Sequence, residues 1–166
     1  EHILHGGFNN LDVTLFSMYP YFCKVESDDL FIVPSAPRHI DLPDEYIVVH
    51  TSGGDKQYRT YPHMDMVIRG FDIPIVQLGG ADDLRCRSDL DLRGRLTWRE
   101  SAWVMRKAKA AVVVDSFLSH LAGAVGTNAV VLYGPAPPKV VRPKAQGCEI
   151  KNLKPDMLAV CRSMTH

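Results

Sequence analysis

The chain has 166 residues and a mass of 18.5 kDa, which is typical of one domain with a single hydrophobic core. Its composition, 46% apolar and 23% charged, excludes a disordered tail, a collagen-like fibre and a coiled-coil rod. Nineteen basic residues balance nineteen acidic ones, so no net positive charge attracts nucleic acid or an anionic membrane surface. Apolar runs such as 110–114 are five residues long, far short of the roughly 20 that span a bilayer. We therefore expect a folded globular domain with no nucleic-acid partner and no transmembrane segment.

The cysteines and histidines give no metal-binding pattern. No two cysteines form a Cys-x-x-Cys pair, which disfavours a structural zinc site or a thioredoxin-type redox site. Free thiols indicate a reducing compartment, so the sequence predicts a cytoplasmic protein without a metal site. The residues in question are Cys23, Cys86, Cys148 and Cys161, with His2 and His5 as the one close histidine pair.

The first 45 residues show little hydrophobic periodicity and are interrupted by Gly6, Gly7, Pro20, Pro34, Pro37 and Pro43. We expect residues 1–45 to be an irregular lead-in segment, with one short strand at 30–33, and residues 46–166 to form the domain. Residues 46–50 are an apolar run that ends in the loop Thr-Ser-Gly-Gly, as a buried strand would. A helix is predicted after Pro62 and a second strand at 73–78, closed by Gly79 and Gly80.

The second half alternates strands and helices more clearly. The sequence Thr-Trp-Arg-Glu at 97–100 fits a capping box, which predicts a helix over 98–109. Its residues Trp98, Ala102, Met105 and Ala108 recur at helical spacing and are expected to be buried. Residues 110–114 form a continuous apolar run, typical of a strand covered on both faces, and Asp115 follows at its carboxyl end.

A helix over 116–125 closed by Gly126, a strand over 129–133 and a last helix near 155–161 complete the pattern. The apolar residues of that last helix are Met157, Leu158 and Cys161. Alternating strands and helices predict an α/β fold, a Rossmann-like parallel sheet with helices on both faces. Ligands of such sheets bind beyond the carboxyl ends of the strands, so the loops after 50, 78, 114 and 133 should share one rim.

The common nucleotide and hydrolase motifs are absent, because the sequence has no Gly-x-Gly-x-x-Gly, P-loop or Gly-x-Ser-x-Gly pattern. Instead, residues 115–120 read Asp-Ser-Phe-Leu-Ser-His at a strand-to-helix junction, where free amides and the helix dipole favour an anion such as a diphosphate. Ser116 is placed to cap the helix and His120 to donate to the anion. The alternative from spacing alone is that Asp115 or Ser116 only caps the helix and His120 is a core residue.

Four stretches of residues 96–138 stand out: Leu-Thr-Trp-Arg-Glu, Ala-Ala-Val-Val-Val-Asp-Ser, Ser-His-Leu-Ala-Gly-Ala-Val-Gly-Thr and Val-Val-Leu-Tyr-Gly-Pro. Together they resemble the donor-binding half of the glycosyltransferase family 9 heptosyltransferases. Upstream, Val-His-Thr-Ser-Gly-Gly and the residues 59–62, Arg-Thr-Tyr-Pro, are similar to the family's first strand and its Lys-x-Trp-Pro element. The resemblance extends over about residues 46–164.

This resemblance implies one half of a GT-B glycosyltransferase, which binds a nucleotide-diphosphate sugar as substrate and needs no metal or other cofactor. It implies that Arg59 contacts the donor phosphates, that Asp115 lies near the sugar or the helix start, and that Ser116 and His120 bind the anion. The implied activity is sugar transfer to the hydroxyl of a glycan or lipid-linked acceptor, as in lipopolysaccharide biosynthesis. The full predicted donor-binding set is Lys56, Arg59, Asp115, Ser116, Ser119, His120 and Gly134.

Two departures from the family pattern leave other functions open. Phe117 stands where the family has glycine, and its side chain would hinder the approach of a diphosphate to the backbone. The acceptor-side carboxylate that would act as base has no counterpart before Tyr46, so no catalytic residue is assigned, and a missing amino-terminal domain or partner chain would supply it. The alternatives are a non-catalytic nucleotide- or carbohydrate-binding module, an interaction domain, and a GT-B-type epimerase.

Overall fold

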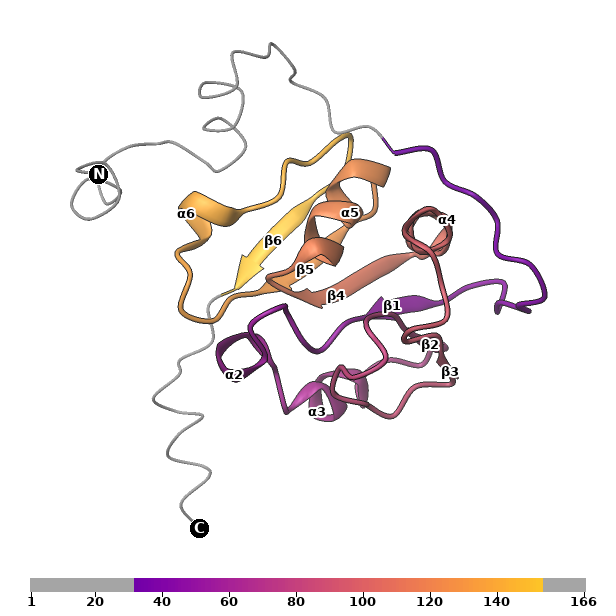
Figure 1. Cartoon of the computed structure of the whole chain (residues 1–166), viewed down its shortest axis with the longest axis horizontal. Coiled ribbons are helices and arrows are strands. Elements are labelled where there is room, and N and C mark those ends of the chain that lie inside the picture. Colours follow the sequence, from indigo (N-terminus) through magenta and orange to yellow (C-terminus); the bar gives the residue numbers. More distant parts are fainter. Residues whose placement is uncertain (1–31, 154–166) are drawn as a thin grey trace.

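The computed structural model describes residues 32–153, which form a parallel six-stranded sheet flanked by helices (Figure 1). The strands run in the order β3-β2-β1-β4-β5-β6, and every neighbouring pair is parallel. The fold class expected from the sequence is therefore confirmed. In chain order the elements are β1 (Ile47–Val49), α2 (Lys56–Arg59), α3 (Met64–Ile68), β2 (Ile75–Gln77), β3 (Leu90–Asp91), α4 (Trp98–Lys107), β4 (Ala110–Val114), α5 (Phe117–Val125), β5 (Ala129–Leu132), α6 (Pro138–Val141) and β6 (Ile150–Leu153).

The order of the strands determines where the edge of the sheet has a crevice for a ligand. From β1 the chain moves outward through β2 to β3, and α4 then returns it to β4 on the other side of β1. The crossover direction thus reverses between β1 and β4, and loops leaving these two strands diverge to opposite faces. In open α/β sheets the crevice at such a switch point is the usual ligand site.

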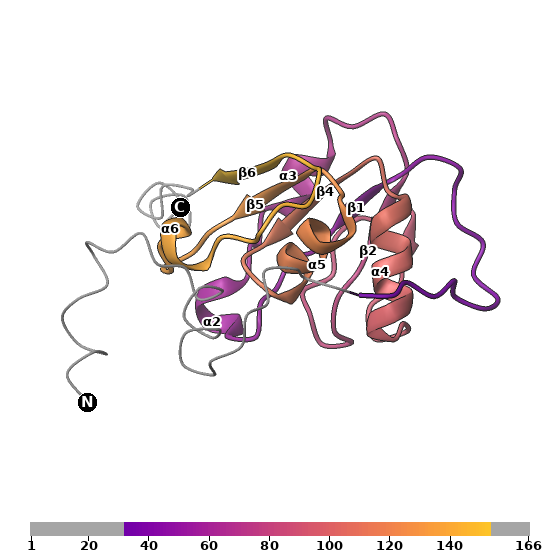
Figure 2. The same cartoon turned by 90° about the horizontal axis from the view of Figure 1, so that it is seen from above.

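The hydrophobic core lies on both faces of the sheet. Helices α4 and α5 cover one face, where Val48 and Val113 pack against Met105 and Leu121 (Figures 1 and 2). Helix α3 covers the other face through Met64 and its neighbours. Because β1 and β4 carry apolar residues on both faces, their side chains are almost entirely buried, as the continuous apolar runs predicted.

Helix α4 begins with the predicted capping box. The Thr97 hydroxyl accepts a hydrogen bond from the Glu100 amide, and the Glu100 carboxylate accepts one from the Thr97 amide. Ala102 and Met105 are fully buried, as expected, but Trp98 is 68% exposed. The prediction for Trp98 was wrong: it is the first residue of the helix, and its ring lies against that of Phe117 rather than in the core, while Val104 is fully buried.

Helix α5 starts directly after β4 and ends where the sequence indicated. Ser116 is its N-cap and accepts a hydrogen bond from the Leu118 amide, while Gly126 ends the helix with a left-handed φ of 78°. A Cβ at Gly123 would collide with the Lys144 carbonyl, so the chain leading to β6 can lie close against this helix.

The sequence missed the short elements α2, β3, α6 and β6. Residues 32–45, the described part of the expected lead-in, contain no helix or strand, and Ile40 and Leu42 pack against the core. The expected strand at 30–33 is not formed by its described residues, 32 and 33, and the helix near 155–161 lies outside the described range, as do His2, His5, Cys23 and Cys161. Cys86 and Cys148 are free thiols.

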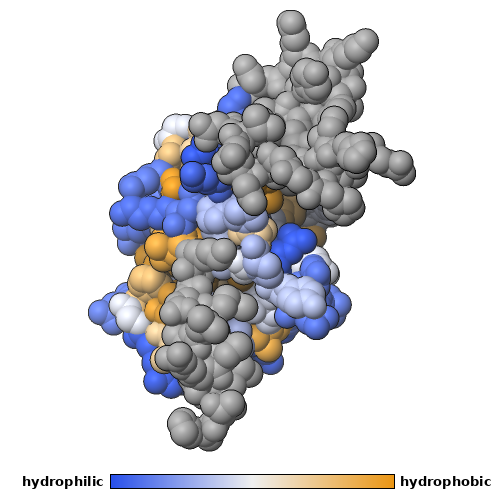
Figure 3. Space-filling view, turned by 90° about the vertical axis from the view of Figure 1, so that its left-hand side faces the viewer, coloured by the Kyte–Doolittle hydropathy of each residue, from blue (hydrophilic) through white to orange (hydrophobic). Residues whose placement is uncertain are grey.

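Within residues 32–153, no helix has the length and apolar character needed to cross a membrane. On the face shown in Figure 3, the coloured residues form hydrophobic patches interleaved with hydrophilic ones.

Candidate functional site

The loop after β1 folds back on itself and carries the basic residues of the site. The Gly53 amide donates to the Arg59 carbonyl (2.8 Å), and the Tyr61 amide donates to the Thr51 carbonyl (2.8 Å). Inside this closed loop, α2 presents Lys56 and Arg59 at the carboxyl end of the sheet. The positions of both basic groups are therefore set by backbone hydrogen bonds.

Arg59 faces Asp115 across the switch point between β1 and β4. Its Nη1 lies 3.9 Å from Asp115 Oδ2, and the Asp115 side chain is almost fully buried. Burial raises the pKa of Asp115 above its ordinary value, and Arg59 only partly offsets this. The Arg59 side chain is 39% exposed, so its guanidinium can also reach a ligand in solvent.

Ser116, the N-cap of α5, is followed three and four positions later by Ser119 and His120, a spacing that places all three on one side of the helix. Ser119 is fully buried, and its hydroxyl donates to the Ser116 carbonyl (2.7 Å), so it supports the helix start rather than reaching a ligand. Burial lowers the pKa of His120, which therefore stays neutral at pH 7 and can act as a hydrogen-bond donor or acceptor but not as a cation.

A cleft of about 570 Å³ opens at the carboxyl ends of β1, β2 and β4. Lys56 and Ser116 are the members of the predicted set that line it. Lys56 forms ion pairs with the exposed carboxylate of Asp82 and with Asp83, whose Oδ1 lies 3.7 Å from Nζ. The pair with Asp82 is exposed and therefore weak, so an anionic ligand can compete with Asp82 for the ammonium group.

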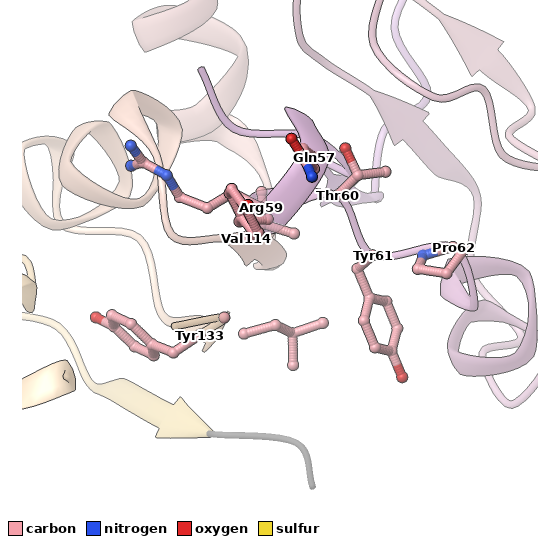
Figure 4. A pocket seen from close by; sticks show the side chains of 10 residues that line it. Gln57, Arg59, Thr60, Tyr61, Pro62, Val114 and Tyr133 are labelled. Atoms are coloured by element: carbon pink, nitrogen blue, oxygen red, sulfur yellow. The ribbon is translucent and has the colours of Figure 1, made fainter. Parts of the chain in front are cut away.

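A second, smaller pocket of about 80 Å³ lies beyond α2, between this helix and the ends of β4 and β5. Arg59 and Gly134 line it, and Figure 4 shows Arg59 and Tyr133 extending to one side while Tyr61 lies at the other. A Cβ at Gly134 would lie 2.5 Å from the Tyr58 carbonyl oxygen, so glycine here permits close contact with the α2 loop. Gly134 thus has a packing role that its Gly-Pro motif alone did not indicate.

Phe117, the departure from the family pattern, stands at the first position of α5 and lines the large cleft. Its ring is 42% exposed and contacts Trp98, with ring centroids 4.4 Å apart. The two aromatic rings come from the starts of α4 and α5. They make an apolar wall beside the amides at the start of α5, where a glycine would leave open space.

Sequence reasoning missed two polar residues of the cleft, His50 and Asp83. His50 Nε2 lies 3.2 Å from Asp83 Oδ2, and His50 Nδ1 lies 3.1 Å from Ser116 Oγ; all three side chains line the cleft. The sequence feature that could have identified His50 was its position at the end of a buried strand. Asp83 could not be found this way, because it meets His50 only when the loop after β2 turns at Gly79 and Gly80.

The structure thus divides the predicted donor-binding set. Lys56 and Ser116 line the large cleft, Arg59 and Gly134 line the smaller pocket, and Asp115 lies buried opposite Arg59. Ser119 lines neither of the two cavities and acts within the helix. Within residues 32–153, no cluster of three or more His, Cys, Asp or Glu side chains is arranged to hold a metal ion.

Residues 81–161 match the family model of glycosyltransferase family 9 (heptosyltransferase), which confirms the resemblance found in the sequence. Three solved structures have a similar fold, each with a TM-score of 0.54. They are a family 9 glycosyl transferase from Veillonella parvula (18% identity, covering 75% of this chain and 41% of that one), ADP-heptose LPS heptosyltransferase II from E. coli (21%, 68% and 39%) and the E. coli heptosyltransferase WaaC with ADP (17%, 76% and 45%). The chain therefore spans about two fifths of their length. No curated protein matches it significantly in sequence.

Proposed function

From the family 9 match of residues 81–161, we propose that this chain binds a nucleotide-diphosphate sugar as the donor-binding part of a glycosyltransferase. The donor would lie at the switch point between β1 and β4. The observation that carries the proposal is the position of Arg59, whose guanidinium is held in the β1 loop beside the β4–α5 junction and remains partly exposed. Lys56, from the same short helix, faces the adjoining cleft.

The electrostatics of this region suit a diphosphate. Arg59 faces Asp115 just before α5, and Lys56 lines the cleft that the start of α5 borders. At this helix start the Phe117 amide has no intrahelical acceptor and the helix dipole is positive. During transfer, negative charge develops on the leaving diphosphate, and positive groups fixed near it lower the barrier. Arg59, Lys56 and the start of α5 would supply that stabilisation in this chain.

Transfer needs an acceptor hydroxyl and a base to deprotonate it. Because this chain spans 39–45% of the similar structures, the base is assigned to a domain or partner chain that binds the acceptor. The same proposal includes a cytoplasmic location and a glycan or lipid-linked acceptor, as in lipopolysaccharide assembly. Support for these finer points comes from the family alone.

Calorimetry with ADP and with an ADP-linked sugar tests donor binding, with UDP and GDP as comparison nucleotides. Arg59→Ala should weaken ADP binding about 10- to 100-fold, the range expected when a hydrogen bond to a charged group is lost. The matched control is Arg106→Ala, because Arg106 lies exposed on α4. Equal affinity of the Arg59→Ala variant and the unchanged chain would refute the proposal, as would failure of every nucleotide to bind.

A non-catalytic nucleotide- or carbohydrate-binding module is the second candidate, and Phe117 is the observation that favours it. Its ring stands where the family's glycine lets a diphosphate approach the backbone. The two candidates differ in turnover. Release of free sugar from the ADP-linked donor, measured beside the calorimetry, selects the transferase; binding without any release selects the module.

A further inference from the structure

Three side chains that line the large cleft are linked in a row by hydrogen bonds. The proposed binding of a diphosphate does not require these hydrogen bonds. Ser116 Oγ lies 3.1 Å from His50 Nδ1, and His50 Nε2 lies 3.2 Å from Asp83 Oδ2. The residues follow the carboxyl ends of β4, β1 and β2, which are neighbours in the sheet. A hydroxyl, an imidazole and a carboxylate linked in this order have the geometry of a nucleophile, its base and the group that orients the base.

Asp83 determines which ring nitrogen of His50 carries the proton. Burial raises the pKa of Asp83, but the hydrogen bonds from His50 and from the Gly80 amide (2.7 Å) outweigh it, so the pKa is lowered and the carboxylate is ionised. An ionised Asp83 accepts a hydrogen bond from His50 Nε2. Neutral His50 then has its lone pair on Nδ1, where it can accept the proton of the Ser116 hydroxyl.

The loop after β2 is shaped to hold Asp83 against His50. Gly79 has a φ of 142°, and a Cβ at this position would collide with Asp83 Oδ2 and lie 3.0 Å from His50 Cδ2. Arg93 donates to the Asp83 carbonyl (2.5 Å), which fixes the backbone of the loop. Asp83 and His50 are each less than 10% exposed, so water competes little for their hydrogen bond.

One side of the cleft offers an apolar surface next to Ser116. Leu96, Trp98, Phe117 and Leu118 line the cleft, and the rings of Trp98 and Phe117 are in contact. Ser116 itself is half-buried and borders the open volume. A small ligand with an apolar acyl group and a polar carbonyl would thus lie with the carbonyl near Ser116 and the acyl group against the two rings.

We propose that Ser116 is a nucleophile with His50 as its base and Asp83 as a positioning residue, and that this relay hydrolyses esters of small apolar carboxylic acids. Ser116 Oγ bonds to the ester carbonyl carbon while its proton passes to His50 Nδ1. The tetrahedral oxyanion lies beside the Phe117 amide, which as the first residue of α5 has no intrahelical acceptor. Collapse breaks the ester C–O bond, and the alcohol leaves with the proton from His50. Water then attacks the acyl-serine, His50 takes and returns one proton, and the carboxylic acid is released.

The experiment uses the full chain with p-nitrophenyl butyrate as substrate and a fluorophosphonate as a serine-directed label. We expect turnover of the ester, and a mass increase on Ser116 with loss of fluoride. Ser116→Asn retains an N-cap acceptor but no nucleophile, and should lose about 100-fold or more of the activity and all of the label. Ser101→Ala is the matched control, since Ser101 also lines the cleft but lies outside the relay.

Two further variants test how the hydroxyl is activated. His50→Gln should abolish labelling while the Gln side chain can still form hydrogen bonds. Asp83→Asn should lower kcat with little change in KM, because a neutral amide orients the His50 ring less strongly than the carboxylate does. The proposal is overturned if the unchanged chain takes up no label, if Ser116→Asn keeps its activity, or if labelling is the same in His50→Gln.

Discussion

Arg59 Nη1 and Asp115 Oδ2 face each other at 3.9 Å where the loop after β1 meets the end of β4. Among the described residues, no group donates a hydrogen bond to this buried oxygen, so Arg59 compensates the charge of Asp115 from a distance. Burial raises the pKa of Asp115 in spite of Arg59. The two residues therefore form an ion pair that leaves both groups partly unsatisfied, and the guanidinium is left available for a further anion.

Asp115→Asn should stabilise the protein at neutral pH. Because the folded-state pKa of Asp115 lies above its ordinary 3.8, the folded protein binds this proton more tightly than the unfolded chain. The stability of the unchanged protein consequently falls as pH rises through the window above 3.8, and an amide avoids this penalty. Urea unfolding at pH 7 should show a higher free energy for Asp115→Asn, with the difference shrinking toward pH 4. A less stable variant at pH 7 would contradict the prediction.

Gly53 and Gly54 provide a matched pair for testing the β1 loop. A Cβ at Gly53 would lie 2.8 Å from Arg59 Cβ and 3.0 Å from the Asp115 carbonyl oxygen, whereas one at Gly54 meets nothing within 4 Å. Gly53→Ala should lower the free energy of unfolding by about 1–3 kcal/mol, the usual cost of overpacking. It should also weaken ADP binding, because Arg59 is displaced. Gly54→Ala should stay within about 0.5 kcal/mol of the unchanged protein. Equal effects of the two substitutions in unfolding and calorimetry would show that the loop tolerates the displacement.

The fold could be predicted because its central strands carry unusually clear patterns. Residues 110–114 and 129–132 are continuous apolar runs, and the capping box at Thr97 and Glu100 places the start of α4 within a residue. These signals are local, since each depends on a few consecutive side chains. The short elements α2, β3 and β6 lack such patterns, because they are two to four residues long and depend on pairing with strands already formed.

The candidate site could be predicted only in part, for a similar reason. Ser116 was found because one segment contains both the strand end and the helix start. Trp98 was assigned to the core from its spacing, but it is the first residue of α4, and its ring contacts Phe117 from a distant part of the sequence, which helical spacing does not reveal. The contacts of His50 with Ser116 and Asp83 span 66 and 33 residues of sequence, and no local pattern records such pairings.

His120 should make the protein less stable in mild acid. Burial lowers its pKa below the ordinary 6.5, so the unfolded chain takes up a proton that the folded protein resists. The free energy of unfolding should therefore decrease as pH falls below about 6.5. His120→Gln should flatten this part of the curve in urea titrations from pH 5 to 8. His63→Gln is the control, since His63 precedes α3 without a side-chain capping bond; a slope that survives in the His120 variant would assign the effect to other groups.

Thr97→Ala should remove the capping box of α4. The threonine hydroxyl accepts from the Glu100 amide, and its loss leaves a helix N–H unsatisfied, so we expect a loss of about 1 kcal/mol in the free energy of unfolding. Thr97→Ser restores the acceptor and should restore most of the stability. Guanidinium denaturation of the three proteins measures the difference. A Ser variant as unstable as the Ala variant would mean that the methyl group, rather than the hydroxyl, matters at this position.

Phe117→Gly should strengthen the binding of a diphosphate at the start of α5. The substitution removes the ring that lines the cleft beside Trp98 and opens the backbone amides to close approach. Because Phe117 is the first residue of the helix and is 42% exposed, little packing is lost. Calorimetry should show about tenfold tighter ADP binding, equivalent to about 1.4 kcal/mol. Phe117→Leu keeps a side chain over the amides and should bind ADP as the unchanged protein does. If the Gly and Leu variants bind ADP equally, the ring does not obstruct the diphosphate, and Phe117 would no longer favour a non-catalytic module over a transferase.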